Sequence, residues 1–357
     1  MTSEPPKRRV SWWQFVLPIL VLVLLFGVVL PQIIDYASVW AAISSLDSSA
    51  VVVLVLLGIL SSWVEAGIYT SLIPGLSYRA GWKAFLGGNS VAGFAPSPWD
   101  IVVRYAMYRG FGVEGSAAGA SVIVGGGFQI AIAVVAPLLV LVGLVATGHG
   151  EQTVRVIAAI GVAIVVGILL VIALILRRER LAKRIGHLLQ NTADWLLPKF
   201  KREPPVDLVT QTMEFRALLL MTLATRWWLS AIFLFSSHII KYLGMLYLFR
   251  EMGIGPETVP ASELLAVYSI GMFMALMPIV PAGLGAVELT YIWLIAGDDP
   301  ALADLVAAAT FTHRIFFWLL PILIGLVPLI RWIRSGNTMS GLDVDADIGS
   351  LTQTTED

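Results

Sequence analysis

Two short stretches of this chain place ionisable side chains beside breaks in apolar sequence. In the first stretch Pro96 and Pro98 precede Asp100, and Arg104 follows four residues later. A spacing of four residues puts Asp100 and Arg104 on one face of a helix. Ionisable groups at membrane depth cost about 2.5–3.5 kcal/mol each on insertion scales, so those that occur there are candidates for function.

The second stretch has prolines and glycines before one carboxylate, and a basic pair follows in the last apolar segment. Its residues are Pro278, Pro281, Gly283, Gly285, Glu288, His313 and Arg314. A helix that restarts after such a break has backbone N–H groups without partners at its first turn, and these attract anions. The guanidinium of arginine offers a planar set of donors that suits phosphate oxygens.

From this chemistry we predict a binding site for an anionic headgroup between the two stretches. Arg104 and Arg314 would contact the headgroup, while Asp100 and Glu288 would pair with them in the empty site or exchange protons. The remaining members of the predicted site are Pro96, Pro281, Gly283, Gly285 and His313. A structural alternative remains open, in which Asp100 pairs with Arg104 and Glu288 with Arg314 to hold helices together.

Other polar residues inside the apolar segments favour structural roles. Glu65 and Arg226 are expected to form a buried pair or to extend toward the membrane interface. We expect His238 and Lys241 to anchor a helix end at the interface. Asn89 and Gln129 are expected to cap or to bridge helices.

No motif for an enzyme or a cofactor stands out. Gly125–Gly127 lacks the Lys-Ser/Thr of a phosphate-binding loop, so we favour close helix packing there. The four histidines are scattered, there is no cysteine, and neither HExxH nor GxSxG occurs. We therefore predict no metal, no cofactor and no catalytic residue, and we regard an enzyme as the less favoured class. The net charge of −1 gives no reason to expect a nucleic-acid partner.

The elements that position these residues are membrane helices. Hydrophobic residues make up 58% of the 357 residues and charged residues only 13%, against about 25% in soluble domains. The mean hydropathy is +0.85. An apolar segment at 12–30 reads as a retained signal anchor, and the other apolar segments are 50–73, 116–146, 154–176, 217–249, 264–294 and 305–330. The prolines and glycines described above interrupt 264–294 and a further segment at 85–107.

The distribution of Lys and Arg predicts the orientation. Basic residues collect in 1–11 and in the loop 177–216, which we place in the cytoplasm, whereas 31–49 has none and is placed outside. The loop is expected either to lie partly as an amphipathic helix on anionic headgroups or to be an ordinary cytoplasmic loop. The acidic tail 334–357 is expected to be disordered and cytoplasmic.

Following this orientation along the chain, the two interrupted segments enter from opposite faces. We therefore predict an all-α, polytopic integral membrane helical bundle with about six full spans and two re-entrant broken-helix hairpins in an inverted repeat. Inverted-repeat transporters form their sites where discontinuous helices meet near the midplane.

The run from Met277 to Glu288 with the later His313–Arg314 resembles the lysylphosphatidylglycerol synthase transmembrane-region family, a flippase-like membrane domain. The resemblance covers about residues 12–333, and Pro96, Asp100 and Arg104 add to it. It implies paired re-entrant hairpins and movement of lipids between leaflets. In relatives the domain precedes a soluble aminoacyl-transferase domain, which is not visible here, so the synthase activity is not carried over.

The sequence thus favours a flippase or transporter in a bacterial inner membrane for an anionic lipid, either a phospholipid or a polyprenyl-phosphate-linked sugar. Membrane lipids would be its partners, with no nucleic acid. Two alternatives remain. One is a membrane-embedded transferase with a lipid-linked donor, using Asp100 or Glu288 as general base. The other is a non-transporting scaffold for a glycosyltransferase or synthase.

Overall fold

A computed structural model describes residues 35–92, 99–146, 178–196, 207–223, 226–276 and 283–335, together with the single positions 28, 31 and 167. All regular structure in these ranges is helical. The helices are α2 (Tyr36–Ser44), α3 (Ser48–Thr70), α4 (Tyr78–Ala92), α5 (Trp99–Gly110), α6 (Gly115–Ala146), α8 (Glu179–Leu196), α9 (Leu208–Leu223), α10 (Trp227–Glu251), α11 (Ala261–Met274), α12 (Ala286–Tyr291), η5 (Ile292–Ala296), α13 (Pro300–Arg314), η6 (Ile315–Leu319) and α14 (Leu320–Arg334).

The described part of the chain contains four helices long and apolar enough to cross a bilayer. They are Ser48–Thr70, Gly115–Val140, Trp227–Glu251 and the continuous run Pro300–Arg334. The prediction of an all-α polytopic membrane protein is confirmed, whereas the number of full spans stays a prediction. The predicted cytoplasmic N-terminus 1–11, the first segment 12–30, the segment 154–176 and the tail from 336 onward lie outside the described residues.

Two of the predicted segments divide differently in the structure. Segment 217–249 covers parts of two helices, because α9 ends at Leu223 and α10 begins at Trp227. In the predicted cytoplasmic loop, 179–196 is helical, and this helix, α8, packs against α9 with Arg180, Lys183 and Arg184 exposed. Whether α8 lies on anionic headgroups stays a prediction.

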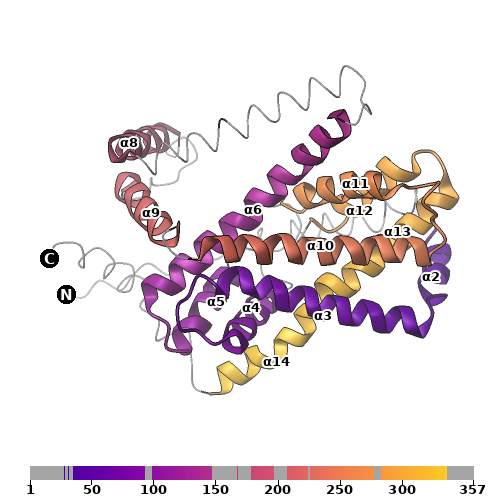
Figure 1. The fold of residues 1–357 in the computed structure, drawn as a ribbon, viewed down its shortest axis with the longest axis horizontal. Coiled ribbons are helices and arrows are strands. Elements are labelled where there is room, and N and C mark those ends of the chain that lie inside the picture. Colours follow the sequence, from indigo (N-terminus) through magenta and orange to yellow (C-terminus); the bar gives the residue numbers. More distant parts are fainter. Residues whose placement is uncertain are drawn as a thin grey trace.

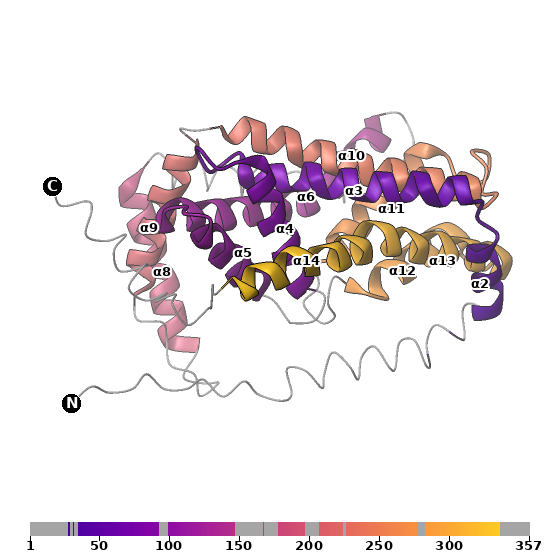
Figure 2. The same ribbon diagram turned by 90° about the horizontal axis from the view of Figure 1, so that it is seen from below.

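Helices α3 and α10 run side by side in opposite directions and form the long axis of the molecule (Figure 1). A hydrogen bond of 2.7 Å between Ser71, just after α3, and Ser230, in the first turn of α10, ties the two helices together. Helices α4 and α5 lie toward this end, and α11 and α12 lie toward the other end (Figures 1 and 2). The inverted repeat itself stays a prediction.

The two ends of the bundle carry opposite charge. Exposed cations lie at the end with α4 and the last turn of α14, namely Arg79, Lys83, Arg331 and Arg334. Asp35, Asp47 and Asp299 cap the starts of α2, α3 and α13 at the opposite end. Such caps satisfy free N–H groups of the first turn. The hydroxyl of Ser49 donates to Asp47 and lowers the pKa of that carboxyl, so Asp47 stays ionised at neutral pH.

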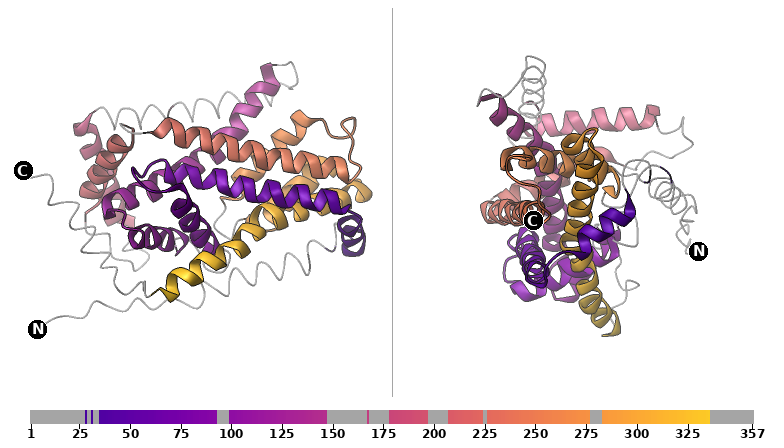
Figure 3. Two further views of the ribbon diagram at one scale, coloured as in Figure 1. Left: turned by 60° about the horizontal axis from the view of Figure 1, so that its bottom comes forward. Right: turned by 90° about the vertical axis from the view of Figure 1, so that its right-hand side faces the viewer.

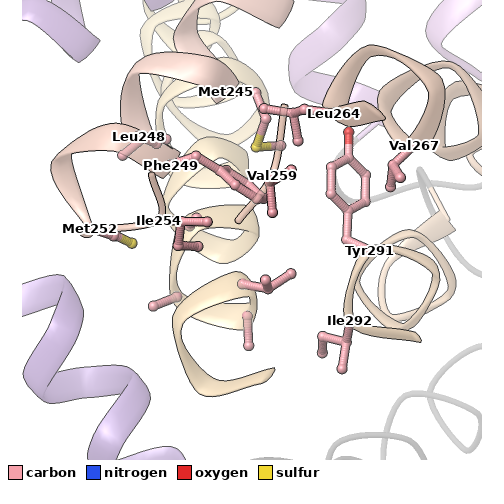
Figure 4. Close-up of a cluster of buried hydrophobic side chains, with 14 of the residues drawn as sticks. Met245, Leu248, Phe249, Met252, Ile254, Val259, Leu264, Val267, Tyr291 and Ile292 are labelled. Atoms are coloured by element: carbon pink, nitrogen blue, oxygen red, sulfur yellow. The ribbon is translucent and has the colours of Figure 1, made fainter. Parts of the chain in front are cut away.

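A cluster of apolar side chains fills the half of the bundle around α10, α11, α12 and α13 (Figure 4). Members labelled in Figure 4 are Met245, Leu248, Phe249, Met252, Ile254, Val259, Leu264, Val267, Tyr291 and Ile292. Seen along the long axis, the continuous α13–α14 run lies among the other helices, and α3, α10 and α12 contact it (Figure 3).

Glycines permit the closest helix contacts in the other half. A Cβ atom at Gly325 of α14 would overlap the backbone carbonyl of Leu86 in α4. Ser90 of α4 donates to the carbonyl of Ile322 at 2.7 Å, one turn earlier on α14. Small residues at such crossings let membrane helices approach closely, which is how α4 seats on α14.

Gly325→Ala is therefore expected to destabilise the protein by about 1–3 kcal/mol, because the overlapping atom belongs to the backbone and cannot move aside. Thermal unfolding in a non-ionic detergent measures this change. Gly126→Ala in α6 is the matched control, since a Cβ atom there meets nothing within 4 Å. Equal unfolding temperatures for the two variants would contradict the proposed contact.

Candidate functional site

The second predicted stretch forms a buried ion pair at the start of α12. Glu288 is fully buried, and one of its carboxylate oxygens lies 2.5 Å from Nε of Arg314. Its other oxygen accepts the backbone N–H of Gly285 at 2.5 Å, and Arg314 also donates to the carbonyl of Gly283 at 3.4 Å. The structure thus brings Gly283, Gly285, Glu288 and Arg314 together, and Pro281 lies outside the described residues.

The local sequence explains this geometry. Gly283 and Gly285 have φ of +63° and +83°, a left-handed conformation that glycine adopts without a steric cost. The turn they form aims the N–H of Gly285 at Glu288, which caps its own helix. Therefore the backbone donor predicted for an anion is occupied by the protein's own carboxylate, and the pairing of Glu288 with Arg314 considered as a structural alternative is formed.

The helix that carries Arg314 is irregular just beyond it. A π-helical turn, η6, runs from Ile315 to Leu319. Pro321 has no N–H to donate to the carbonyl four residues earlier, which favours a wider turn at this place. Such turns occur often at functional sites.

Arg104 lies in the first hairpin in different surroundings. It is only 4% exposed, and Nη2 donates to Oδ1 of Asn89 at 2.9 Å. Its guanidinium carbon sits 4.2 Å from the ring centre of Tyr69 and 5.2 Å from that of Phe85. Its Nε has no hydrogen-bond partner among the described residues, and no ion pair joins it to Asp100 there. The direct contacts of the cation are therefore neutral, and the carboxylate of Asp100 acts on it only from beyond ion-pair distance.

Glycine explains how α5 brings Arg104 this deep. A Cβ atom at Gly88 of α4 would lie 2.9 Å from the carbonyl oxygen of Asp100 and 3.1 Å from Nε of Arg104. The missing side chain lets the two helices of the hairpin close on each other. Asp100 is only partly buried in the first turn of α5, and Pro96 lies outside the described residues.

His313 joins two helices. Its Nε2 donates to the backbone carbonyl of Lys241 in α10 at 2.9 Å, and its ring stacks on Phe317 with 4.3 Å between the ring centres. No described hydrogen bond or ion pair joins Arg104 to Arg314 or to His313. A single headgroup between Arg104 and Arg314 therefore stays a prediction.

A second group of polar side chains was not predicted to act together. Lys241 pairs with Glu65 at 2.7 Å, Gln129 donates to Glu65 at 2.6 Å, and His238 lies 3.2 Å from Gln129. Tyr268 extends the chain, with its hydroxyl 3.3 Å from Nδ1 of His238. These five residues, from α3, α6, α10 and α11, are called the Glu65 network below.

Two sequence predictions are wrong here. Glu65 pairs with Lys241, so the predicted pair with Arg226 is wrong; Arg226 is exposed at the start of α10, and its extension toward the interface stays a prediction. Lys241 and His238 are inside the bundle and do not anchor a helix end. Their spacing of three residues on one face of α10 was the available signal that they act together. Gln129 does bridge helices, as predicted.

The glycine run in α6 was correctly assigned to packing at one of its positions. A Cβ atom at Gly125 would overlap the ring of Tyr69, whereas Gly126 and Gly127 face open space. The absence of a side chain at Gly125 thus makes room for the ring of Tyr69, which lies against the guanidinium of Arg104. The described residues contain no group of three acidic, histidine or cysteine side chains arranged to hold a metal.

Comparison with known proteins places this fold in context. The sequence model of the family named "Lysylphosphatidylglycerol synthase TM region" matches residues 15–325. A UPF0104 membrane protein of Methanothermobacter thermautotrophicus is 37% identical over 86 residues. That similarity spans 24% of this chain and 23% of the relative's length, so it adds support over only a part of either protein.

Proposed function

The chain belongs to the lysylphosphatidylglycerol synthase TM region family, and on this basis we propose that it moves an anionic lipid between the leaflets of a membrane. The headgroup crosses through the polar interior of the bundle, while the acyl chains stay in the bilayer. A phospholipid and a polyprenyl-phosphate-linked sugar both have the phosphate that the interior cations suit.

The observation that carries this proposal is the environment of Arg104. A buried cation is costly unless an opposite charge balances it. The described partners of Arg104 are an amide and two aromatic rings, all neutral. A lipid phosphate would supply the missing charge and would accept from Nε, which has no described partner.

The charge at the two ends of the bundle supports an orientation. Positive residues collect on the cytoplasmic side of inner-membrane proteins. Arg79, Lys83 and the arginines at the end of α14 therefore belong to the cytoplasmic face of a bacterial inner membrane, with the capping aspartates outside. With this orientation we retain the sequence-based proposal that both termini are cytoplasmic.

The test is lipid movement by the purified full-length chain in phosphatidylcholine vesicles. Fluorescent phosphatidylglycerol is placed in both leaflets, and dithionite added outside bleaches only the label that reaches the outer leaflet. We expect complete bleaching with the protein and partial bleaching in empty vesicles. A second set of vesicles with a labelled polyprenyl-phosphate sugar distinguishes the two lipid classes.

Labelled phosphatidylcholine is the control for charge, since its headgroup is zwitterionic and should move more slowly. If well-folded protein accelerates none of the three lipids, the transport proposal fails. A scaffold for a glycosyltransferase or synthase would then be the better reading, and co-purification of such an enzyme would support it.

A further inference from the structure

The Glu65 network has a defined hydrogen-bond direction. An ionised carboxylate only accepts hydrogen bonds, so the group of Gln129 that faces Glu65 is its amide nitrogen. The amide oxygen then faces His238 and accepts from Nε2. Nδ1 of His238 is left as the acceptor for the hydroxyl of Tyr268. Every donor in the network points toward Glu65.

The place of the Glu65 carboxylate is thus an anion site built from the ammonium of Lys241 and the amide of Gln129. One carboxylate oxygen accepts from Lys241 at 2.7 Å and the other from Gln129 at 2.6 Å. His238 and Tyr268 hold the amide in the required orientation. In the present structure the anion is the protein's own side chain.

This anion site lies deep along the candidate spans. Lys241 is ten residues before the end of α10 at Glu251, or about 15 Å at 1.5 Å per residue, half of a core about 30 Å thick. The side chains of Lys241 and Glu65 keep 17% and 15% of their surface exposed, whereas Glu288 is fully buried.

Stability gives no sufficient reason for this pair. Replacing a buried ion pair with apolar residues is often neutral or stabilising. Charges inside membrane helices tend to mark the path of a substrate or an ion. The described partners of Lys241 and Glu65 come from three different candidate spans, which is the arrangement of a binding site at a helix junction.

The network also touches the other ion pair. The backbone carbonyl of Lys241 accepts from His313, and the next residue, Arg314, pairs with Glu288. Lys241 and Arg314 are therefore each paired with an internal carboxylate, and the hydrogen bond from His313 links the two helices, α10 and α13, that carry them.

We propose that Lys241 and Gln129 form a second binding position for a phosphate-bearing amphiphile, in which Glu65 is an internal counter-ion that the phosphate displaces. The class of ligand rests on the proposed function. The position itself rests on the geometry of the Glu65 network and does not depend on whether lipid crosses the bilayer.

The test is a calorimetric titration that measures the binding of dodecyl phosphate to the full chain in a non-ionic detergent. Removing the competing carboxylate in Glu65→Gln is expected to tighten binding about tenfold, and Lys241→Gln is expected to weaken it about tenfold. In the double variant the gain from Glu65→Gln should vanish, because it acts through Lys241. Glu263→Gln, at an exposed position in the first turn of α11, controls for the change of net charge.

Inorganic phosphate distinguishes a site for the free anion from a site for a lipid headgroup. If free phosphate shows the same tenfold change in Glu65→Gln, the site takes phosphate and not a lipid headgroup, which overturns the ligand class. If folded Glu65→Gln binds dodecyl phosphate as the unaltered chain does, or keeps its gain without Lys241, the counter-ion proposal is overturned. Should Glu65→Gln not fold, Glu65→Asp keeps the charge but draws it back from Lys241, and about threefold tighter binding is expected.

These outcomes are distinct from those of the transport test. A tenfold change in binding without lipid movement would uphold the site and reject the flippase. Lipid movement with unchanged binding in Glu65→Gln would uphold the flippase and reject the site.

Discussion

Replacing Arg104 by glutamine is expected to slow lipid movement about 10- to 100-fold, because a hydrogen bond to a charged group contributes about 1.5–3 kcal/mol. Glutamine retains an amide that can donate to Asn89, yet it has no charge to attract a phosphate. The described surroundings of Arg104 hold no carboxylate within ion-pair distance, so no negative partner there is left uncompensated. We therefore expect the unfolding temperature of Arg104→Gln to stay level or rise.

A fall in transport without a fall in the unfolding temperature would identify a binding role for Arg104. The vesicle assay and thermal unfolding in detergent are measured on the same preparation. Arg79→Gln, at an exposed position in the first turn of α4, removes one positive charge away from the described contacts of Arg104 and should change neither. Arg104→Lys keeps the charge but loses the planar donors, and an intermediate rate is expected.

A different result would assign Arg104 to the scaffold. If Arg104→Gln unfolds at a clearly lower temperature and its transport falls only in proportion to the folded fraction, then the guanidinium holds the hairpin together. Its contacts with Tyr69 and Phe85 would be the reason.

The second large effect is expected at Glu288. Glu288→Ala removes the partner of Arg314 and the cap of Gly285 together, leaving a cation inside the bundle. Breaking a buried ion pair from one side costs about 3–5 kcal/mol, so we expect a large fall in the unfolding temperature. Glu263→Ala, at an exposed position of α11, is the matched control and should have little effect.

A double variant distinguishes the contribution of the Glu288–Arg314 ion pair to stability from the contributions of the two residues taken singly. Glu288→Gln with Arg314→Gln removes both charges and keeps neutral hydrogen-bonding groups, so part of the lost stability should return. If the double variant is no more stable than Glu288→Ala, the loss comes from the cap at Gly285 and not from the unpaired cation.

Local features of the sequence were sufficient for the class of fold. An apolar segment of span length is a property of consecutive residues, and so is a break made by proline and glycine. In the described residues α4 ends at Ala92 and α5 begins at Trp99, while α11 ends at Met274 and α12 begins at Ala286, on either side of the predicted breaks. The capping role of Glu288 also depends on a spacing of three residues, which the sequence contains.

The partners of the buried charges required the tertiary structure. Glu65 and Lys241 are 176 residues apart, and nothing in their spacing distinguishes Lys241 from Arg226 as the partner. The choice depends on how far α3 and α10 overlap and which faces they turn to each other. The contact of Ser71 with Ser230 marks one end of that overlap, and Arg226 is exposed beyond it.

The sequence by itself therefore determined that the chain is an all-α membrane protein with two interrupted helices and a few deep charges. Only the tertiary structure decided which of these charges are balanced: Glu288 covers Arg314, Glu65 covers Lys241, and Arg104 rests on neutral groups. The physical reason is the distance over which each kind of interaction acts. Hydrophobicity and helix breaks act over neighbouring residues, whereas an ion pair or hydrogen bond forms only within about 3–4 Å, between residues that folding alone brings together.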